Sequence, residues 1–75
     1  MNDRHNRIAG CQAAVDAARL QCDIAGRRLA DAIIEFQDNG GLALSSNVEL
    51  ASKDYRAKQE SYAENLEYLA DALRR

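Results

Sequence analysis

A run of small and apolar residues between Ile8 and Phe36 places the tightest limit on how this chain can fold. From Ile8 onward these residues recur at alternating steps of three and four without interruption. This spacing is typical of one long helix that presents a single seam of side chains to another helix. The residues of this first seam are Ile8, Cys11, Val15, Ala18, Cys22, Ala25, Leu29, Ala32 and Phe36.

The second half of the chain complements the first half by side-chain volume. The first seam is small around Cys11 and Ala18 and becomes large toward Phe36, and the second half shows the reverse order. Large side chains therefore meet small ones when the chain folds back about Leu42, which lets two helices interdigitate. The predicted pairs are Phe36 with Val48, Ile33 with Ala51, Leu29 with Tyr55, Cys22 with Tyr62, Ala18 with Leu66, Val15 with Leu69 and Cys11 with Leu73. The sequence thus predicts an all-α fold, an antiparallel two-helix hairpin.

We expect one domain over residues 1–75, with a first helix over about 4–38, a turn over 39–45 and a second helix over about 46–74. Asn39 or Gly40 is predicted to cap the first helix. Ser46 and Glu49 match a capping box, which predicts that the second helix starts there. Because two helices in a single layer cannot enclose a core, the hairpin is expected to dimerise into a four-helix bundle, or alternatively to dock on a larger partner.

Composition and charge restrict the cellular setting and the partners that we expect. The net charge of -2 gives no general attraction to nucleic acid or to an anionic membrane. The polar opening MNDRHNR leads into no apolar stretch long enough for a signal peptide or a transmembrane helix. We therefore expect a cytoplasmic protein.

No group of residues in the sequence is suited to catalysis, and no cofactor or metal site is expected. The one histidine, His5, lies among Asn and Arg residues in the polar lead-in, and neither cysteine has a neighbouring base. Cys11 and Cys22 would lie about 16 Å apart along a helix, beyond the reach of a disulfide. Reduced thiols are the favoured interpretation, and an intermolecular bridge or a metal role is the alternative.

Apolar residues outside the seam are the candidates for binding another protein. A second stripe runs along roughly the opposite side of the first helix, and further apolar residues line one flank of the second helix. These candidate residues are Ala13, Ala17, Leu20, Ile24, Ile34, Leu50 and Tyr68. Such a stripe on a small domain indicates homo-oligomer packing or a groove for a different protein, and ordinary surface is the third interpretation.

Two further features leave alternatives open. Glu60, Glu64, Glu67 and Asp71 form an acidic ridge, which is either a solvated face or a docking strip for a basic partner. Gly26 stands in mid-helix, where glycine costs about 1 kcal/mol relative to alanine. It either makes room for the stem of Lys58 or provides a functional kink.

These observations predict a small non-enzymatic interaction module, acting as an adaptor, a chaperone-like protein or an inhibitor, that binds another protein through an apolar helix face. We expect a homodimer that also has a heterologous protein partner. The alternative is a dimeric nucleic-acid-binding regulator, because the two termini of a hairpin meet and bring their basic residues to one end. That cluster comprises Arg4, His5, Arg7, Arg74 and Arg75.

Overall fold

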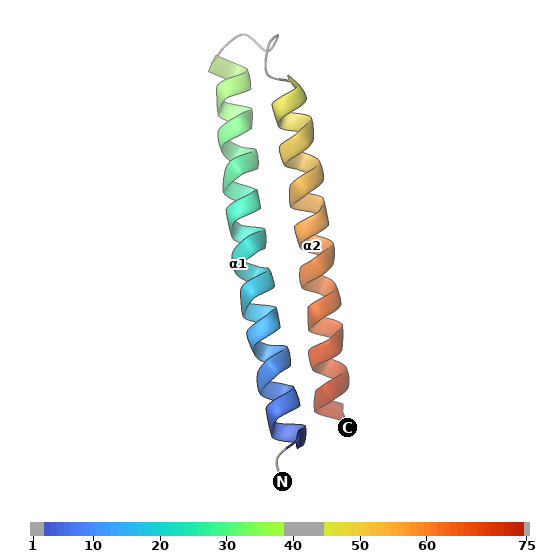
Figure 1. Ribbon diagram of the computed structural model, residues 1–75. Coiled ribbons are helices and arrows are strands. Elements are labelled where there is room, and N and C mark those ends of the chain that lie inside the picture. The colour runs from blue at the N-terminus through green and yellow to red at the C-terminus, as the bar shows by residue number, and fades with distance from the viewer. Residues whose placement is uncertain (1–2, 39–44, 75) are drawn as a thin grey trace.

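The computed structural model describes residues 3–38 and 45–74 and shows two long α-helices packed against each other. Helix α1 spans Asp3–Asp38 and helix α2 spans Ser45–Arg74. The helices run antiparallel and side by side along their length, and the N-terminus of α1 lies next to the C-terminus of α2 (Figure 1). The Cα atoms extend over 60 × 13 × 12 Å. The predicted all-α helical hairpin is confirmed, whereas its dimerisation stays a prediction.

Each helix begins one residue earlier than expected. Because α2 starts at Ser45, Ser46 lies within the first turn and does not precede it as an N-terminal cap. The predicted caps at Asn39 and Gly40 and the turn around Leu42 lie outside the described residues.

The first seam is present as predicted. All its residues are buried or half-buried, and Ala25 is only 2% exposed. The sequence period of three and four therefore identified the packed side of α1.

The second seam differs from the predicted one in its last two turns. Leu66 and Leu73 were expected against α1, yet they are 40% and 51% exposed, whereas Ala72 is 5% exposed. The regular heptad spacing places Asn65 and Ala72 in the seam, because the steps of three and four continue through them. The prediction was wrong here because it chose the leucines for their hydrophobicity. The observed seam of α2 is Val48, Ala51, Tyr55, Lys58, Tyr62, Asn65, Leu69 and Ala72, all buried or half-buried.

The two alternating positions of each seam carry different kinds of residue. With Ile8 and Val48 as heptad position a, the a positions are mostly large and apolar, and the d positions are small or polar. The a residues are Ile8, Val15, Cys22, Leu29, Phe36, Val48, Tyr55, Tyr62 and Leu69. The d residues are Cys11, Ala18, Ala25, Ala32, Ala51, Lys58, Asn65 and Ala72. Ile33 was also expected to pack against Ala51, but it follows the d residue Ala32 and is exposed.

Gly26 makes room for an aromatic ring. A Cβ atom at Gly26 would lie 3.3 Å from Cε1 of Tyr55, so the ring packs directly on the α1 backbone. The expectation that Gly26 accommodates Lys58 is therefore wrong, and α1 continues as one helix through this position. Lys58 Nζ instead lies 3.6 Å from Oδ1 of Asp54, one turn earlier on its own helix. Tyr55 was predicted opposite Leu29, so it lies one turn nearer the start of α1 than expected.

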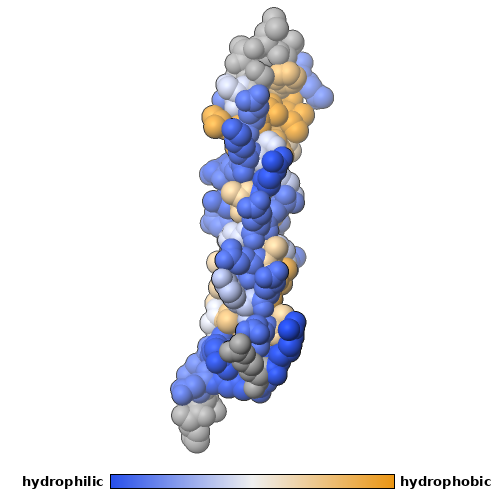
Figure 2. All heavy atoms as spheres, turned by 90° about the vertical axis from the view of Figure 1, so that its right-hand side faces the viewer, coloured by the Kyte–Doolittle hydropathy of each residue, from blue (hydrophilic) through white to orange (hydrophobic). Residues whose placement is uncertain are grey.

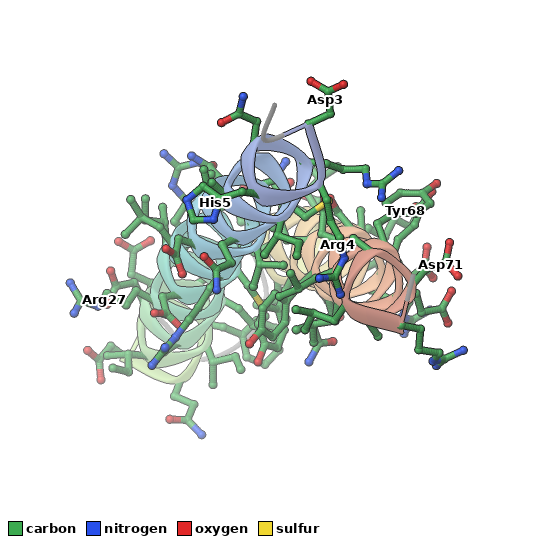
Figure 3. The ribbon with its side chains drawn as sticks, turned by 90° about the horizontal axis from the view of Figure 1, so that it is seen from below. Asp3, Arg4, His5, Arg27, Tyr68 and Asp71 are labelled. Atoms are coloured by element: carbon green, nitrogen blue, oxygen red, sulfur yellow. The ribbon has the colours of Figure 1, made fainter. Side chains whose placement is uncertain are left out.

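A hydrogen bond joins the two ends of the hairpin. Nη2 of Arg4 donates to the carbonyl oxygen of Leu73 at 3.2 Å. The carbonyl groups in the last turn of a helix lack partners within the helix and carry partial negative charge. Figure 3 shows Arg4 reaching from the start of α1 to the end of α2. The bond holds the beginning of α1 against the last turn of α2.

Candidate interaction surfaces

A stripe of apolar residues on α1 lies mostly on the side away from α2, and its member Ala17 also borders the groove between the helices. Ala13, Ala17 and Leu20 are exposed, Ile24 is half-buried, and Leu20 shows 59% of its surface. Their spacing of four, three and four places them in one line of about 16 Å along the helix. We call these four residues the α1 stripe. Ile34 is also exposed but lies ten residues, about 15 Å, beyond the end of the stripe.

The two predicted binding residues of α2 do not lie together. Leu50 is 65% exposed near the start of α2, and Tyr68 is exposed near its end. Eighteen residues of helix separate them, which corresponds to about 27 Å. Figure 2 faces the α2 side of the hairpin and shows apolar patches that are separated by hydrophilic atoms. The structure therefore places Leu50 and Tyr68 on separate patches, apart from the α1 stripe.

Tyr68 belongs to the acidic ridge rather than to an apolar surface. Its hydroxyl donates a hydrogen bond of 2.9 Å to Oε1 of Glu64. That hydrogen bond is the main reason why the pKa of Tyr68 is raised, and the negative charges of Glu64 and Glu67, together with slight desolvation, add to the effect. Tyr68 and Asp71 project from the same side of α2 in Figure 3.

The acidic ridge is exposed throughout. Glu60, Glu64, Glu67 and Asp71 all lie on the outer surface of α2. One open hollow lies beside the ridge near the C-terminal end of α2, and its lining includes Glu67, Tyr68 and Arg74. The ridge therefore offers carboxylates to solvent without a cavity that would enclose a ligand.

An open groove lies between the helices where small residues of α1 face polar residues of α2. It has a volume of about 350 Å³, and its lining consists of Ala14, Ala17, Ala18, Gln21, Lys58, Ser61 and Asn65. Two of its polar side chains already have partners, since Lys58 pairs with Asp54 and Nδ2 of Asn65 donates to the carbonyl oxygen of Ser61 at 2.8 Å. The sequence interpretation missed this groove because it filled the space opposite Ala18 with Leu66. The sequence did contain a signal for this groove, because alanines of the first helix stand opposite Lys58 and Asn65 at heptad spacing.

The basic end of the hairpin is only partly available to a ligand. His5, Arg7 and Arg74 are exposed, but the guanidinium of Arg4 is engaged with the last turn of α2. In Figure 3 His5 points away from Arg4. Arg75 lies outside the described residues. The side chains of Arg4 and His5 therefore do not point toward one phosphate-sized site.

Cys11 and Cys22 are free, half-buried thiols. Within residues 3–38 and 45–74, no three side chains of His, Cys, Asp or Glu come together in a way that would hold a metal ion. Neither α1 nor α2 contains a stretch apolar enough to cross a membrane.

Comparisons with protein-family models, with curated proteins and with solved structures find no match for this chain. The surfaces described above therefore carry the functional argument by themselves.

Proposed function

We propose that this protein is a small non-enzymatic interaction module that binds another protein through the α1 stripe. One observation carries the proposal, namely that Leu20 stands 59% exposed in a line with Ala13 and Ala17 on an uninterrupted helix. Neither described helix covers this line. Grouped apolar side chains on a small domain are typical of surfaces that associate with a partner.

The shape of the stripe favours a helix as the partner element. Alanines at steps of three and four from Leu20 leave a shallow track along α1, and a helix that brings its own large side chains can approach such a track closely. This is the recognition mode in which an amphipathic helix aligns apolar anchors at successive turns. An adaptor, a chaperone-like protein or an inhibitor would each act by covering part of its partner in this way.

A capture experiment tests the proposal. The tagged protein is incubated with lysate of the cells that express it, and bound proteins are identified by mass spectrometry. Leu20→Glu is expected to abolish capture of a specific partner, because it places an unpaired charge in the apolar contact. Leu50→Glu is the matched control, since Leu50 is at least as exposed but lies on α2. Equal capture by the wild type and by Leu20→Glu would refute the assignment of the stripe.

The nucleic-acid alternative receives less support from the structure. Binding through phosphate contacts needs several free cations on one surface. Arg4 already bonds to the carbonyl oxygen of Leu73, and His5 points elsewhere. No observation on the described residues favours this function over protein binding.

A further inference from the structure

One broad side of the hairpin collects the large side chains of both seams. Two observations identify this side. The ring of Tyr55, an a residue of α2, lies on Gly26, which directly follows the d residue Ala25. Heptad position e, immediately after d, therefore lies on the same side as the a residues.

The opposite broad side is the one with the groove. Its lining includes Ala14, Gln21 and Ser61, each of which directly precedes an a residue and so occupies position g. The small d residues open toward that side. The hairpin is thus two-sided. The g side is lined mainly by small or polar residues, whereas the other side carries the large a residues together with large apolar residues at three e positions.

Three of the exposed large residues belong to the a/e side. Ile33, Leu66 and Leu73 all occupy position e, and all three are exposed. The a residues next to them are mostly only half-buried, and no large side chain of the described helices is fully buried. We call the a and e positions of both helices the large-residue face. These side chains form one side of an apolar core. In a single hairpin the other side of that core is exposed to solvent.

We propose that the large-residue face is the self-association surface, and that a second copy of this chain covers it to complete a four-helix bundle. Core-facing helices of such bundles carry apolar residues at a and d together with e or g. Here the a positions and most d positions are apolar, and Ile33, Leu66 and Leu73 extend this pattern to position e. Two hairpins supply four long helices, so one further copy closes the bundle. This goes beyond the proposed function and does not depend on it.

The scarcity of charged residues at the a and e positions supports the large-residue face as the self-association surface. The chain has ten basic and twelve acidic residues, yet Arg19 is the only one of them at an a or e position of α1 or α2. The centres of protein interfaces are depleted of charge because a buried charge must give up its hydration. The α1 stripe, by contrast, has Asp16 beside it and Arg27 one turn beyond its end at Ile24.

The available area is sufficient for a stable dimer. The hairpin is 60 Å long, and two helices about 9 Å apart and about 11 Å in diameter make a face about 20 Å wide. The face thus covers about 1,200 Å² in projection, against the roughly 800 Å² per partner of a standard stable interface. The chain exposes 5731 Å², whereas a compact protein of its mass exposes about 4,600 Å². The excess is of the size that such an interface would remove.

Sedimentation equilibrium of the full chain tests the proposal. The wild type is expected at twice its 8.3 kDa chain mass at micromolar concentration, and its melting temperature is expected to rise with concentration. Leu66→Glu is expected to weaken dimerisation at least about tenfold, because it places a charge inside the bundle. Leu50→Glu serves as the control and is expected to leave dimerisation unchanged, since Leu50 lies outside the a and e positions.

The result can be separated from a folding defect. Both leucines are exposed in the single hairpin, so circular dichroism of each variant, recorded at high concentration, is expected to show retained helicity. If Leu66→Glu unfolds even there, Leu73→Glu replaces it at the end of the same row. A wild type that stays monomeric and helical at the highest attainable concentration would overturn the proposal. Equal dissociation by Leu50→Glu and Leu66→Glu would also overturn it, because the face would then be wrongly assigned.

Discussion

Gly26 and Gly10 provide a matched pair of substitutions that tests the packing of the two helices. Both glycines lie within α1, where replacement by alanine gains about 0.8–1.0 kcal/mol of helix stability. Beyond its chain neighbours and the surrounding helix backbone, a Cβ atom at Gly10 would have no atom within 4 Å, whereas one at Gly26 would lie 3.3 Å from Cε1 of Tyr55. Gly10→Ala is therefore expected to deliver the full gain.

The Tyr55 ring reduces the gain at Gly26. Carbon atoms attract best at about 3.5–4.0 Å, so the ring must retreat by a few tenths of an ångström. The atoms involved are at the far end of a half-buried side chain, which can shift at a cost below the roughly 0.5–1.5 kcal/mol of a strained rotamer. We expect Gly26→Ala to stabilise the hairpin by about half as much as Gly10→Ala, or about 0.4 kcal/mol.

Thermal unfolding at one fixed protein concentration provides the assay. One kcal/mol corresponds to about 4–8 °C for a domain of this size, so the two variants should differ by about 2–4 °C. A double-mutant cycle isolates the contact, because Gly26→Ala in a Tyr55→Leu background should recover the full gain. Equal shifts for Gly10→Ala and Gly26→Ala in the wild-type background would refute the close approach of Tyr55 to α1.

Three further perturbations test other parts of the structure. Ala25→Leu should destabilise the hairpin by about 1–3 kcal/mol in urea unfolding because Ala25 is 2% exposed, whereas Ala18→Leu should be nearly neutral since it can extend into the groove. Equal losses of stability for Ala25→Leu and Ala18→Leu would mean that other side chains already fill the groove. Glu64→Gln should lower the pKa of Tyr68 in an ultraviolet titration, with Tyr68→Phe identifying its signal. Because the folded pKa of Tyr68 is raised, the Tyr68–Glu64 contact stabilises the fold below the ordinary tyrosine pKa of about 10 and is lost as the pH rises through the folded value. An unchanged pKa would show that the hydrogen bond is absent in solution. Generic DNA duplex at low salt should not be retarded in a gel shift, and retardation that weakens steeply with salt would revive the basic end as a binding site.

The sequence was sufficient to predict the packed side of α1 from its periodicity, and the hairpin from the reversed order of side-chain volumes in the two halves of the chain. Steps of three and four recur without interruption from Ile8 to Phe36, and a helix turns such a period into one face whatever the partner is. The same rule would have identified the α2 seam if spacing had been followed through Asn65 and Ala72. Hydrophobicity was the poorer guide, because Leu66 lies next to the seam and faces solvent in the single hairpin.

The candidate surfaces were only partly predictable. Exposure of Leu20 follows from its place opposite the seam, but the neighbours of Tyr55 and Tyr68 depend on side-chain directions that a sequence does not fix. Gly26 illustrates this limit of prediction. The sequence shows that a glycine frees space in the first helix, but it does not show that the ring of Tyr55 fills that space. The two-sided character of the hairpin appeared only when the Tyr55–Gly26 contact showed where position e lies.

The α1 stripe and the large-residue face lie on different sides of the molecule, and this separation has a functional consequence. The stripe occupies heptad positions f and c of α1, which point away from the a and e positions. A bundle built on the large-residue face therefore leaves Leu20 of each copy on its outer surface. Two identical stripes on one rigid body bind a dimeric or repetitive partner in a linked manner, so that the second contact forms at a high effective concentration. Leu66→Glu should then weaken binding to such a partner without touching the stripe, whereas binding to a monomeric partner should be unaffected.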